Sequence, residues 1–271
     1  MKTRIIAGAI LLPLLLAVVL FLPKFCTAIL FGLMAAIGAR EMLMGTDLVT
    51  QSRLVTYAMV MGFFVVLWSS MWSVYSLLLL GVFAFACMLF VELLICNNTL
   101  PIEKVSLIFV AGWLIPFLLG AVVRIYNQLF GRVFILLPFV IAFSSDTFAY
   151  FAGCALGKHK LCPVISPKKT IEGFVGGLLG AVIGVAAYCL VMDKFLHLQV
   201  NYIYVPIYGI LGSLAAVLGD LSFSVIKRQT GIKDYGNLIP GHGGILDRFD
   251  SMVVVAPLVE VLMLYIPMVV K

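Results

Sequence analysis

The stretch LVTYAMVMGFFVVLWSSMWSVYSLLLLGVFAFACMLFV, from Leu54 to Val91, contains no charged residue. A helix needs about 20 mostly apolar residues to cross the roughly 30 Å hydrocarbon core of a bilayer, so this stretch is long enough for two crossings. The segment Ser69-Ser70-Met71-Trp72-Ser73 marks the break between them. This stretch therefore predicts a membrane protein built from helices.

Similar apolar runs occur along the whole chain, whose mean hydropathy is +1.19. Because 63% of its residues are hydrophobic and only 11% are charged, an ordinary soluble domain is excluded. The start, Met1-Lys2-Thr3-Arg4, resembles a secretory signal, but the apolar run that follows is longer than a signal core. We expect that run to stay in the protein as its first membrane helix. We predict an all-α, polytopic integral membrane protein with about nine transmembrane helices, two of them within 54–91 and the others at 5–23, 26–37, 105–123, 134–151, 173–192, 195–219 and 252–270.

The basic residues indicate how the chain is oriented in the membrane. The net charge of +6 does not indicate nucleic-acid binding, because a cytoplasmic N-terminus and nine spans place most of the 18 Lys and Arg residues on one side. Such an excess is typical of cytoplasmic loops. We therefore predict a multi-pass protein of the inner (plasma) membrane, with both long polar loops in the cytoplasm.

The two halves of the chain differ in character, although no linker or convincing internal repeat separates them. Residues 1–130 are nearly featureless apolar helices with short connections, one of them marked by Arg40-Glu41, and we interpret them as a scaffold half. Residues 131–271 form the site-bearing half of the same single integral membrane domain, 1–271. The six cysteines form no C-x-x-C pair, so we interpret them as inert buried thiols rather than zinc ligands. Glu92 and Glu260 are each either a paired structural acid or a cavity liner.

The densest polar stretch is GDLSFSVIKRQTGIKDYGNLIPGHGGILDRFDS at positions 219–251. Ionisable groups are costly beside a bilayer, so their concentration here indicates a function. Asp220, Ser224 and Lys227 stand at i, i+4 and i+7 and share one helix face, with Asp220 at the end of the eighth span. Asp220 and Asp247 border the same loop from two helices, an arrangement that can clamp a hard cation such as Mg²⁺ together with substrate phosphates.

The turn Pro240-Gly241-His242-Gly243-Gly244 lies inside this loop. Its glycines allow the backbone N–H groups to approach phosphate oxygens closely. His242 alone would be a weak signal, since a loop histidine is often plain polar surface, but its neighbours favour a phosphate contact. Because Asp247 is predicted to lie on a surface loop, we expect Asp247→Asn to abolish turnover with little effect on folding.

Two further stretches carry polar residues. In the sixth predicted span, Asp146 and Tyr150 share a helix face, and Asp146 either pairs with a basic residue or supports or contacts a metal ion. Ser166-Pro167 predicts a turn with Pro167 at the first position of the next helix, where N–H groups attract anions. Lys168 and Lys169 would then form either a membrane-surface anchor or a phosphate site. The glycines that follow, 173, 176, 177 and 180, have the spacing of close helix packing.

At these residues the chain resembles the phosphatidate cytidylyltransferase family, also called CDP-diacylglycerol synthase. The family motif, S-x-x-K-R, four residues, K-D, then P-x-H-G-G-x-x-D-R-x-D, is met at every fixed position between Ser224 and Asp250. Residues 166–173 and the Asp146-x-x-Ala149-Tyr150 pattern are similar to two other family features. The resemblance is strong over 144–251, whereas the first half resembles the family only in its hydrophobic character.

The resemblance implies transfer of CMP from CTP to phosphatidic acid, giving CDP-diacylglycerol and pyrophosphate in phospholipid synthesis. It implies Mg²⁺ and a second, monovalent cation (K⁺), the lipid bilayer as a partner, no nucleic acid, and a homodimer as a plausible assembly. The implied metal ligands are Asp220 and Asp247. The implied catalytic residues are Asp220, Asp247, Lys227, Arg228 and His242, and the implied substrate-binding residues are Lys168, Lys169, Ser224, Lys233, Asp234, Arg248, Asp250 and Asp146.

This chemistry agrees with the residues present. The lipid phosphate is already ionised at neutral pH, so its attack on the α-phosphorus of CTP needs positioning and charge neutralisation rather than a general base. The alternatives are a CTP-dependent lipid kinase, a cytidylyltransferase for a polyprenyl lipid, a transporter and a structural scaffold. A transporter would place its charges near the bilayer midplane, and a scaffold would not need the 219–251 cluster.

Overall fold

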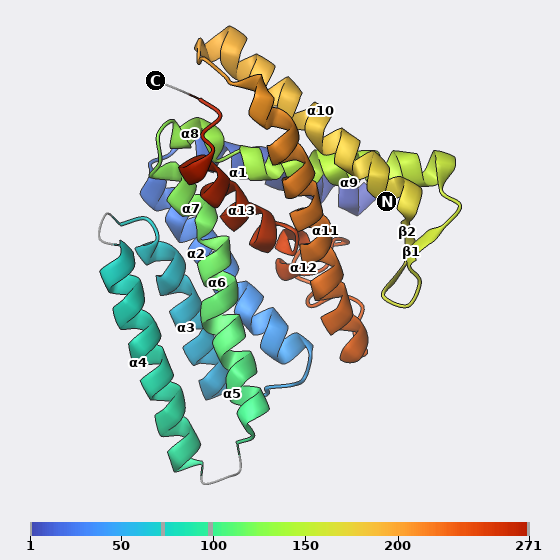
Figure 1. Cartoon of the computed structure of the whole chain (residues 1–271). Helices are drawn as coiled ribbons and strands as arrows, with labels where there is room; N and C mark the ends of the chain where they lie inside the picture. Colours follow the sequence, from blue (N-terminus) through green and yellow to red (C-terminus); the bar gives the residue numbers. More distant parts are fainter. Residues whose placement is uncertain (1, 72–73, 97–99, 270–271) are drawn as a thin grey trace. The chain divides into compact units, whose positions relative to one another are not determined.

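The computed structural model describes residues 2–71, 74–96 and 100–269 of the chain (Figure 1). The chain divides into two compact units. Unit 1 comprises the described residues of Met1–Leu129 and Gln229–Phe249, and unit 2 those of Phe130–Arg228 and Asp250–Lys271. The loop that follows position 228 thus belongs with the N-terminal helices, although the helices before and after it belong to unit 2.

Unit 1 is built from apolar helices joined by short connections. The boundary predicted near Ser69 between two membrane spans lies between the end of one helix and the start of the next. Trp72 and Ser73 lie outside the described residues. The elements are α1 (Lys2–Phe21), α2 (Lys24–Gly45), α3 (Ser52–Trp68), α4 (Val74–Ile95), α5 (Ile102–Phe109), the π-helical turn η1 (Val110–Leu114), α6 (Ile115–Leu119), α7 (Ala121–Tyr126) and the short α12 (Leu246–Phe249).

The core of unit 1 forms where α3 packs against α2 and against the α5–η1–α6 helix (Figure 1). Gly112 lets the backbones approach, because a Cβ there would lie 2.8 Å from Ala58 Cα. The π-turn that contains Gly112 lies just before Pro116, whose missing N–H and bulky ring disturb the α-helical hydrogen-bond ladder. Buried Glu92 accepts a hydrogen bond from Arg53, which identifies it as a paired acid.

Unit 2 combines long helices with one small hairpin. Its elements are α8 (Gly131–Phe134), α9 (Leu137–Leu156), β1 (Lys160–Cys162), β2 (Ser166–Thr170), α10 (Ile171–Leu196), the 3₁₀ turn η2 (Tyr202–Tyr204), α11 (Val205–Gln229) and α13 (Met252–Tyr265). Strands β1 and β2 pair antiparallel. Figure 1 shows α9 and α10 side by side, with the hairpin at one end of the pair.

The glycines of α10 allow this close contact with α9, as their spacing predicted. A Cβ at Gly173 would lie 2.8 Å from the carbonyl oxygen of Ala149, and a Cβ at Gly177 would lie 3.1 Å from that of Ser145. Buried Ser145 also exchanges a 2.7 Å hydrogen bond with Ser213 of α11. The small residues and this polar pair hold three helices of unit 2 together.

Two sequence predictions about element boundaries are wrong. The helix predicted at 195–219 begins only at Val205, because α10 continues to Leu196, and it runs on to Gln229, so that Asp220 lies inside the helix. Residues 166–170 form strand β2 and not the first turn of a helix. The helix begins one residue later than the strand ends, because the Thr170 side chain accepts a 3.1 Å hydrogen bond from Gly173 N–H and caps it.

Within the described ranges, six helices are long and apolar enough to cross a membrane. They are Lys24–Gly45, Tyr75–Ile95, Ile102–Tyr126, Gly131–Leu156, Ile171–Leu196 and Tyr202–Gln229, and Ser52–Trp68 is a shorter apolar helix. The chain is thus a mostly helical membrane protein, and the expected number of nine spans stays a prediction.

Candidate active site

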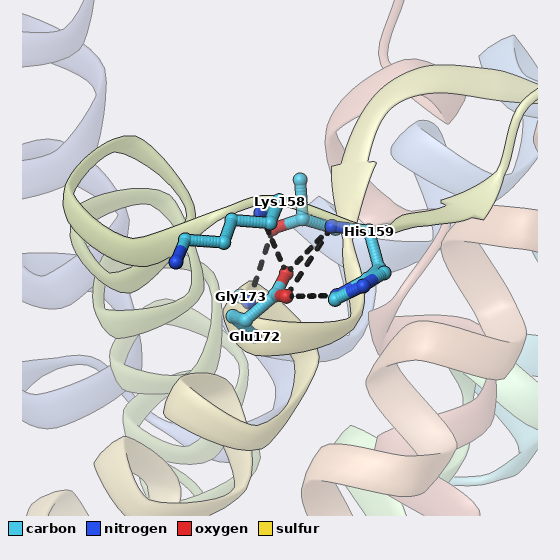
Figure 2. A network of polar contacts seen from close by, with 5 residues as sticks. Lys158, His159, Glu172 and Gly173 are labelled. Atoms are coloured by element: carbon cyan, nitrogen blue, oxygen red, sulfur yellow. Dashed lines mark hydrogen bonds and ion pairs between the residues drawn. The ribbon is translucent and has the colours of Figure 1, made fainter.

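The β1–β2 hairpin of unit 2 carries Lys168 and Lys169 and is held to helix α10 by hydrogen bonds. Glu172, in the first turn of α10, accepts hydrogen bonds from the backbone N–H groups of Lys158 (3.1 Å) and His159 (3.2 Å). The Nδ1 atom of His159 lies 2.7 Å from the same carboxylate (Figure 2). These contacts fasten the start of the hairpin to the helix that follows it. No role was predicted for Glu172 or His159, because their contact forms only when the hairpin folds back.

Lys169 and Asp220 face each other within unit 2. The Lys169 Nζ atom of β2 lies 2.5 Å from Asp220 Oδ2 of α11. Ser224 Oγ, one turn further along α11, lies 3.2 Å from Asp220 Oδ1, which confirms the predicted shared face. The side chains of Lys169 and Asp220 are 27% and 30% exposed, so both are accessible from solvent. This carboxylate already accommodates one cationic group.

A cavity of about 460 Å³ opens beside this pair. Asp146 lines it from α9, as expected for an acid inside a membrane helix. Lys168 and Lys169 contribute positive charge, whereas Phe174 and Val217 form apolar parts of the wall. The cavity therefore joins a basic region to an apolar one, which suits a ligand with both characters. At the edge of the hairpin, Arg228 Nε donates a 3.3 Å hydrogen bond to the carbonyl of Ile165.

Asp250 and Lys227 lie buried in unit 2, each 9% exposed. Burial, and after it the nearby Asp220 carboxylate, raise the pKa of Asp250 from 3.8 to about 7. The N–H of Ser251, 2.7 Å from Asp250 Oδ1, and the Lys227 ammonium oppose this shift. The carboxylates of Asp220 and Asp250 therefore lie close enough in unit 2 to repel each other, and Lys227 partly offsets this repulsion.

The loop of unit 1 is folded around Asp247. Its Oδ2 atom accepts hydrogen bonds from the N–H groups of Tyr235 (2.8 Å) and Gly244 (3.0 Å). Asp247 lies in the short helix α12 and is only 8% exposed, so the expectation of a surface carboxylate is wrong. Tertiary contacts bury it, because the two ends of the loop close over the carboxylate.

The glycine-rich turn has a defined backbone conformation, and its contact with phosphate stays a prediction. Gly241 and Gly243 adopt φ values of 76° and 84°, in the left-handed region that favours glycine. They let the chain reverse so that Ile239 N–H donates to the Gly243 carbonyl at 2.9 Å. Arg248 Nε donates at 2.8 Å to the carbonyl of His242. The turn is therefore a preformed structure and not an open loop.

A second cavity, of about 440 Å³, lies within this loop. Its lining contains the basic residues Lys233, His242 and Arg248, together with Asp234, Gly236, Asn237, Ile239, Gly241 and Gly243. The Nδ1 atom of His242 is buried and has no hydrogen-bond partner in the described part of the chain. Basic side chains, glycine backbone and an unpartnered ring nitrogen together suit an anionic ligand.

One carboxylate of this region escaped the sequence analysis. Glu41 is part of α2 and not of a connection, and it is 6% exposed. Its two oxygens accept hydrogen bonds from the N–H groups of Ile245 (3.0 Å) and Leu246 (2.9 Å). The sequence did contain one signal, because a lone acid inside an apolar run needs a partner. The partner could not be identified, since it lies some 200 positions further along the chain.

The predicted site residues thus fall into two groups. Unit 2 brings together Asp146, Lys168, Lys169, Asp220, Ser224, Lys227, Arg228 and Asp250, and unit 1 brings together Lys233, Asp234, His242, Asp247 and Arg248. Asp220 and Asp247 belong to different units, and their sharing of one metal ion stays a prediction.

Fold and polar clusters together define a class: a helical membrane protein whose ionisable residues gather in two pockets beside glycine-rich or lysine-rich segments. The model of the Cytidylyltransferase family matches residues 2–266. The chain therefore belongs to this family.

Curated relatives agree with this membership. The chain is 48% identical over 134 residues to the phosphatidate cytidylyltransferase of Staphylococcus epidermidis, an alignment that covers 49% of this chain and 50% of the relative. It is 47% identical over 136 residues to that of Staphylococcus saprophyticus, with 50% and 51% covered. It is 41% identical over 162 residues to that of Bacillus subtilis, with 59% of each chain covered. The chain thus spans about half the length of the first of these relatives.

Proposed function

We propose that this protein is a phosphatidate cytidylyltransferase, which transfers CMP from CTP to phosphatidic acid and forms CDP-diacylglycerol and pyrophosphate. The observation that carries the proposal is the complete motif from Ser224 to Asp250, whose second part is folded around Asp247 and lines a basic cavity. Family membership over 2–266 and the names of the relatives support it.

The reaction is a substitution at phosphorus. An oxygen of the lipid phosphate forms a bond to the α-phosphorus of CTP, the bond between that phosphorus and the bridging oxygen to the β-phosphate breaks, and pyrophosphate leaves with the electron pair. The nucleophile is already ionised, so the protein supplies positioning and charge neutralisation. Lys233, His242 and Arg248 hold one set of phosphate oxygens, and Lys168 and Lys169 hold another.

The residues also fit a hard cation. Asp220 and Asp247 offer carboxylate oxygens, and Asp220 already holds the Lys169 ammonium. Within the described ranges no three His, Cys, Asp or Glu side chains form a metal cluster. Mg²⁺ is usually bound by one or two carboxylates together with substrate phosphates. Bound there, Mg²⁺ would neutralise charge on the leaving pyrophosphate, and we propose K⁺ as a second, monovalent cation.

The cavity of unit 2 suits the lipid substrate. Its lysines can bind the phosphate headgroup, and its lining residues Phe174 and Val217 offer apolar surface for the first carbons of the acyl chains. We propose that the chain crosses the inner membrane about nine times and that its polar loops face the cytoplasm, where CTP is available. The excess of basic residues predicted for that side supports this orientation.

The test is pyrophosphate release by the detergent-purified protein, given CTP, phosphatidic acid and Mg²⁺, with each component omitted in turn. We expect release only when all three are present, and labelled cytidine in the lipid phase. A folded protein that releases no pyrophosphate with Mg²⁺ and K⁺ present would refute the proposal. Release with a polyprenyl phosphate in place of phosphatidic acid would instead identify the alternative lipid acceptor.

A further inference from the structure

The C-terminal half of α2 presents one face to the loop of unit 1. Gly38, Glu41 and Gly45 stand at i, i+3 and i+7 and therefore share this face. A Cβ at Gly38 would lie 3.6 Å from the Leu246 side chain, and a Cβ at Gly45 would collide with the carbonyl oxygen of Tyr235. Gly38 thus leaves room for the Leu246 side chain, and Gly45 leaves room for the loop backbone at Tyr235.

Glu41 lies in a seat that glycines keep open. A Cβ at Gly236 would lie 2.5 Å from Glu41 Oε1, and a Cβ at Gly244 would overlap Glu41 Oε2. Gly236 does not have a positive φ, so its glycine identity is explained by this contact and not by backbone strain. Gly236 and Gly244 both belong to the loop of unit 1, so the glycines of the loop make room for the Glu41 side chain of α2.

The carboxylate of Glu41 divides its two oxygens between two successive N–H groups. Oε1 accepts from Ile245 at 3.0 Å and Oε2 accepts from Leu246 at 2.9 Å. These residues directly precede Asp247, whose Oδ2 binds the N–H of Gly244 on the other side. The three consecutive N–H groups at 244–246 are therefore all bound by carboxylates, and the direction of the Asp247 side chain follows from them.

We propose that Glu41 is a positioning residue of the transferase: it clamps the turn at 244–246 so that Asp247 and His242 are held in the geometry the reaction needs. The clamp itself follows from the contacts of unit 1. Its effect on turnover rests on the function proposed above. Glu41 does not touch the reacting atoms in this assignment, and it acts through the backbone of the loop.

Two variants disturb the clamp from opposite sides. Glu41→Gln keeps the size of the side chain but replaces one accepting oxygen with an NH₂ group that faces an N–H donor. Gly236→Ala pushes a methyl group into the seat of an unchanged Glu41. Each has a matched control: Glu92→Gln alters another buried glutamate of unit 1, which pairs with Arg53, and Gly38→Ala adds a methyl group where only ordinary contact results.

The first measurement is hydrogen–deuterium exchange of the full-length protein in detergent. We expect peptides that contain residues 244–246 to exchange at least about 10-fold faster in Glu41→Gln and Gly236→Ala, because hydrogen-bonded amides exchange through local opening. Both controls should retain the exchange of the unmodified protein. Unchanged exchange in the two clamp variants would overturn the proposal, and if Glu41→Gln does not fold, Gly236→Ala alone decides.

The second measurement separates kcat from KM. One charge-assisted hydrogen bond corresponds to a factor of about 10 to 100, so we expect kcat of Glu41→Gln to fall by that factor while KM for CTP changes by less than about 3-fold. Faster exchange at 244–246 with an unchanged kcat would overturn the positioning role. If the unmodified protein releases no pyrophosphate, the proposed function fails, and the exchange experiment still decides whether Glu41 clamps the loop.

Discussion

Asp247→Asn tests both parts of the interpretation of the unit 1 loop. Asn can place its oxygen where Oδ2 lies and still accept from the N–H groups of Tyr235 and Gly244. Two charge-assisted hydrogen bonds then become neutral, which costs about 2 kcal/mol in the free energy of unfolding. In Asp247→Ala, two buried N–H groups lose their acceptor, at about 1–3 kcal/mol each, so the loss is about 2–6 kcal/mol.

The activity should respond differently from the stability. If Asp247 holds the metal ion and neutralises charge in the transition state, Asp247→Asn lowers kcat by at least about 10²–10³-fold. The assay is pyrophosphate release at saturating CTP, phosphatidic acid and Mg²⁺, combined with thermal unfolding of the same preparation. Asp193→Asn, which alters an exposed carboxylate that accepts from Tyr202 Oη, serves as the matched control.

Two results would refute this reasoning. A folded Asp247→Asn protein with a near-normal kcat would remove Asp247 from the metal site. An Asp247→Ala protein as stable as Asp247→Asn would show that the two N–H contacts do not stabilise the loop.

Three further changes test unit 2. Lys169→Ala should raise the KM for CTP or phosphatidic acid roughly 10-fold, which is the factor for the loss of one charged contact, and should leave membrane insertion normal. A defect confined to insertion would instead support the anchor interpretation. In EDTA, the free energy of unfolding should fall as the pH rises from about 4 to about 7. The reason is that Asp250 has a pKa of about 7 in the folded protein and therefore keeps its proton to a higher pH than an unfolded Asp. The full loss is about 4 kcal/mol. Asp250→Asn should remove this pH dependence of stability and should be more stable than the unmodified protein at pH 8. An equal pH dependence of the melting temperature in both proteins would contradict the raised pKa of Asp250. Thr170→Val should cost about 0.5–2 kcal/mol by removing the cap of α10, and Thr170→Ser should restore most of it; equal melting temperatures for the two variants would exclude the cap.

The sequence was sufficient for features that depend on local pattern. Apolar length predicted a helical membrane protein, and the glycine spacing of 173–180 predicted close packing of α10. The i, i+4 spacing of Asp220 and Ser224 predicted that they share a helix face. The long motif of 224–250 led to the family because each fixed position could be checked against the chain. Such features need no knowledge of which segments meet.

Features that depend on distant segments were decided only by the tertiary structure. Pro167 was expected to start a helix, but pairing with β1 draws residues 166–170 into a strand, and the cap of Thr170 delays the helix. Asp247 was expected on the surface, but the folded loop buries it. Glu41 carried no motif, because what defines it is a pair of N–H groups some 200 residues away. A sequence records which side chains are present, whereas hydrogen bonds to backbone groups and the burial of a charge exist only once the chain has closed on itself.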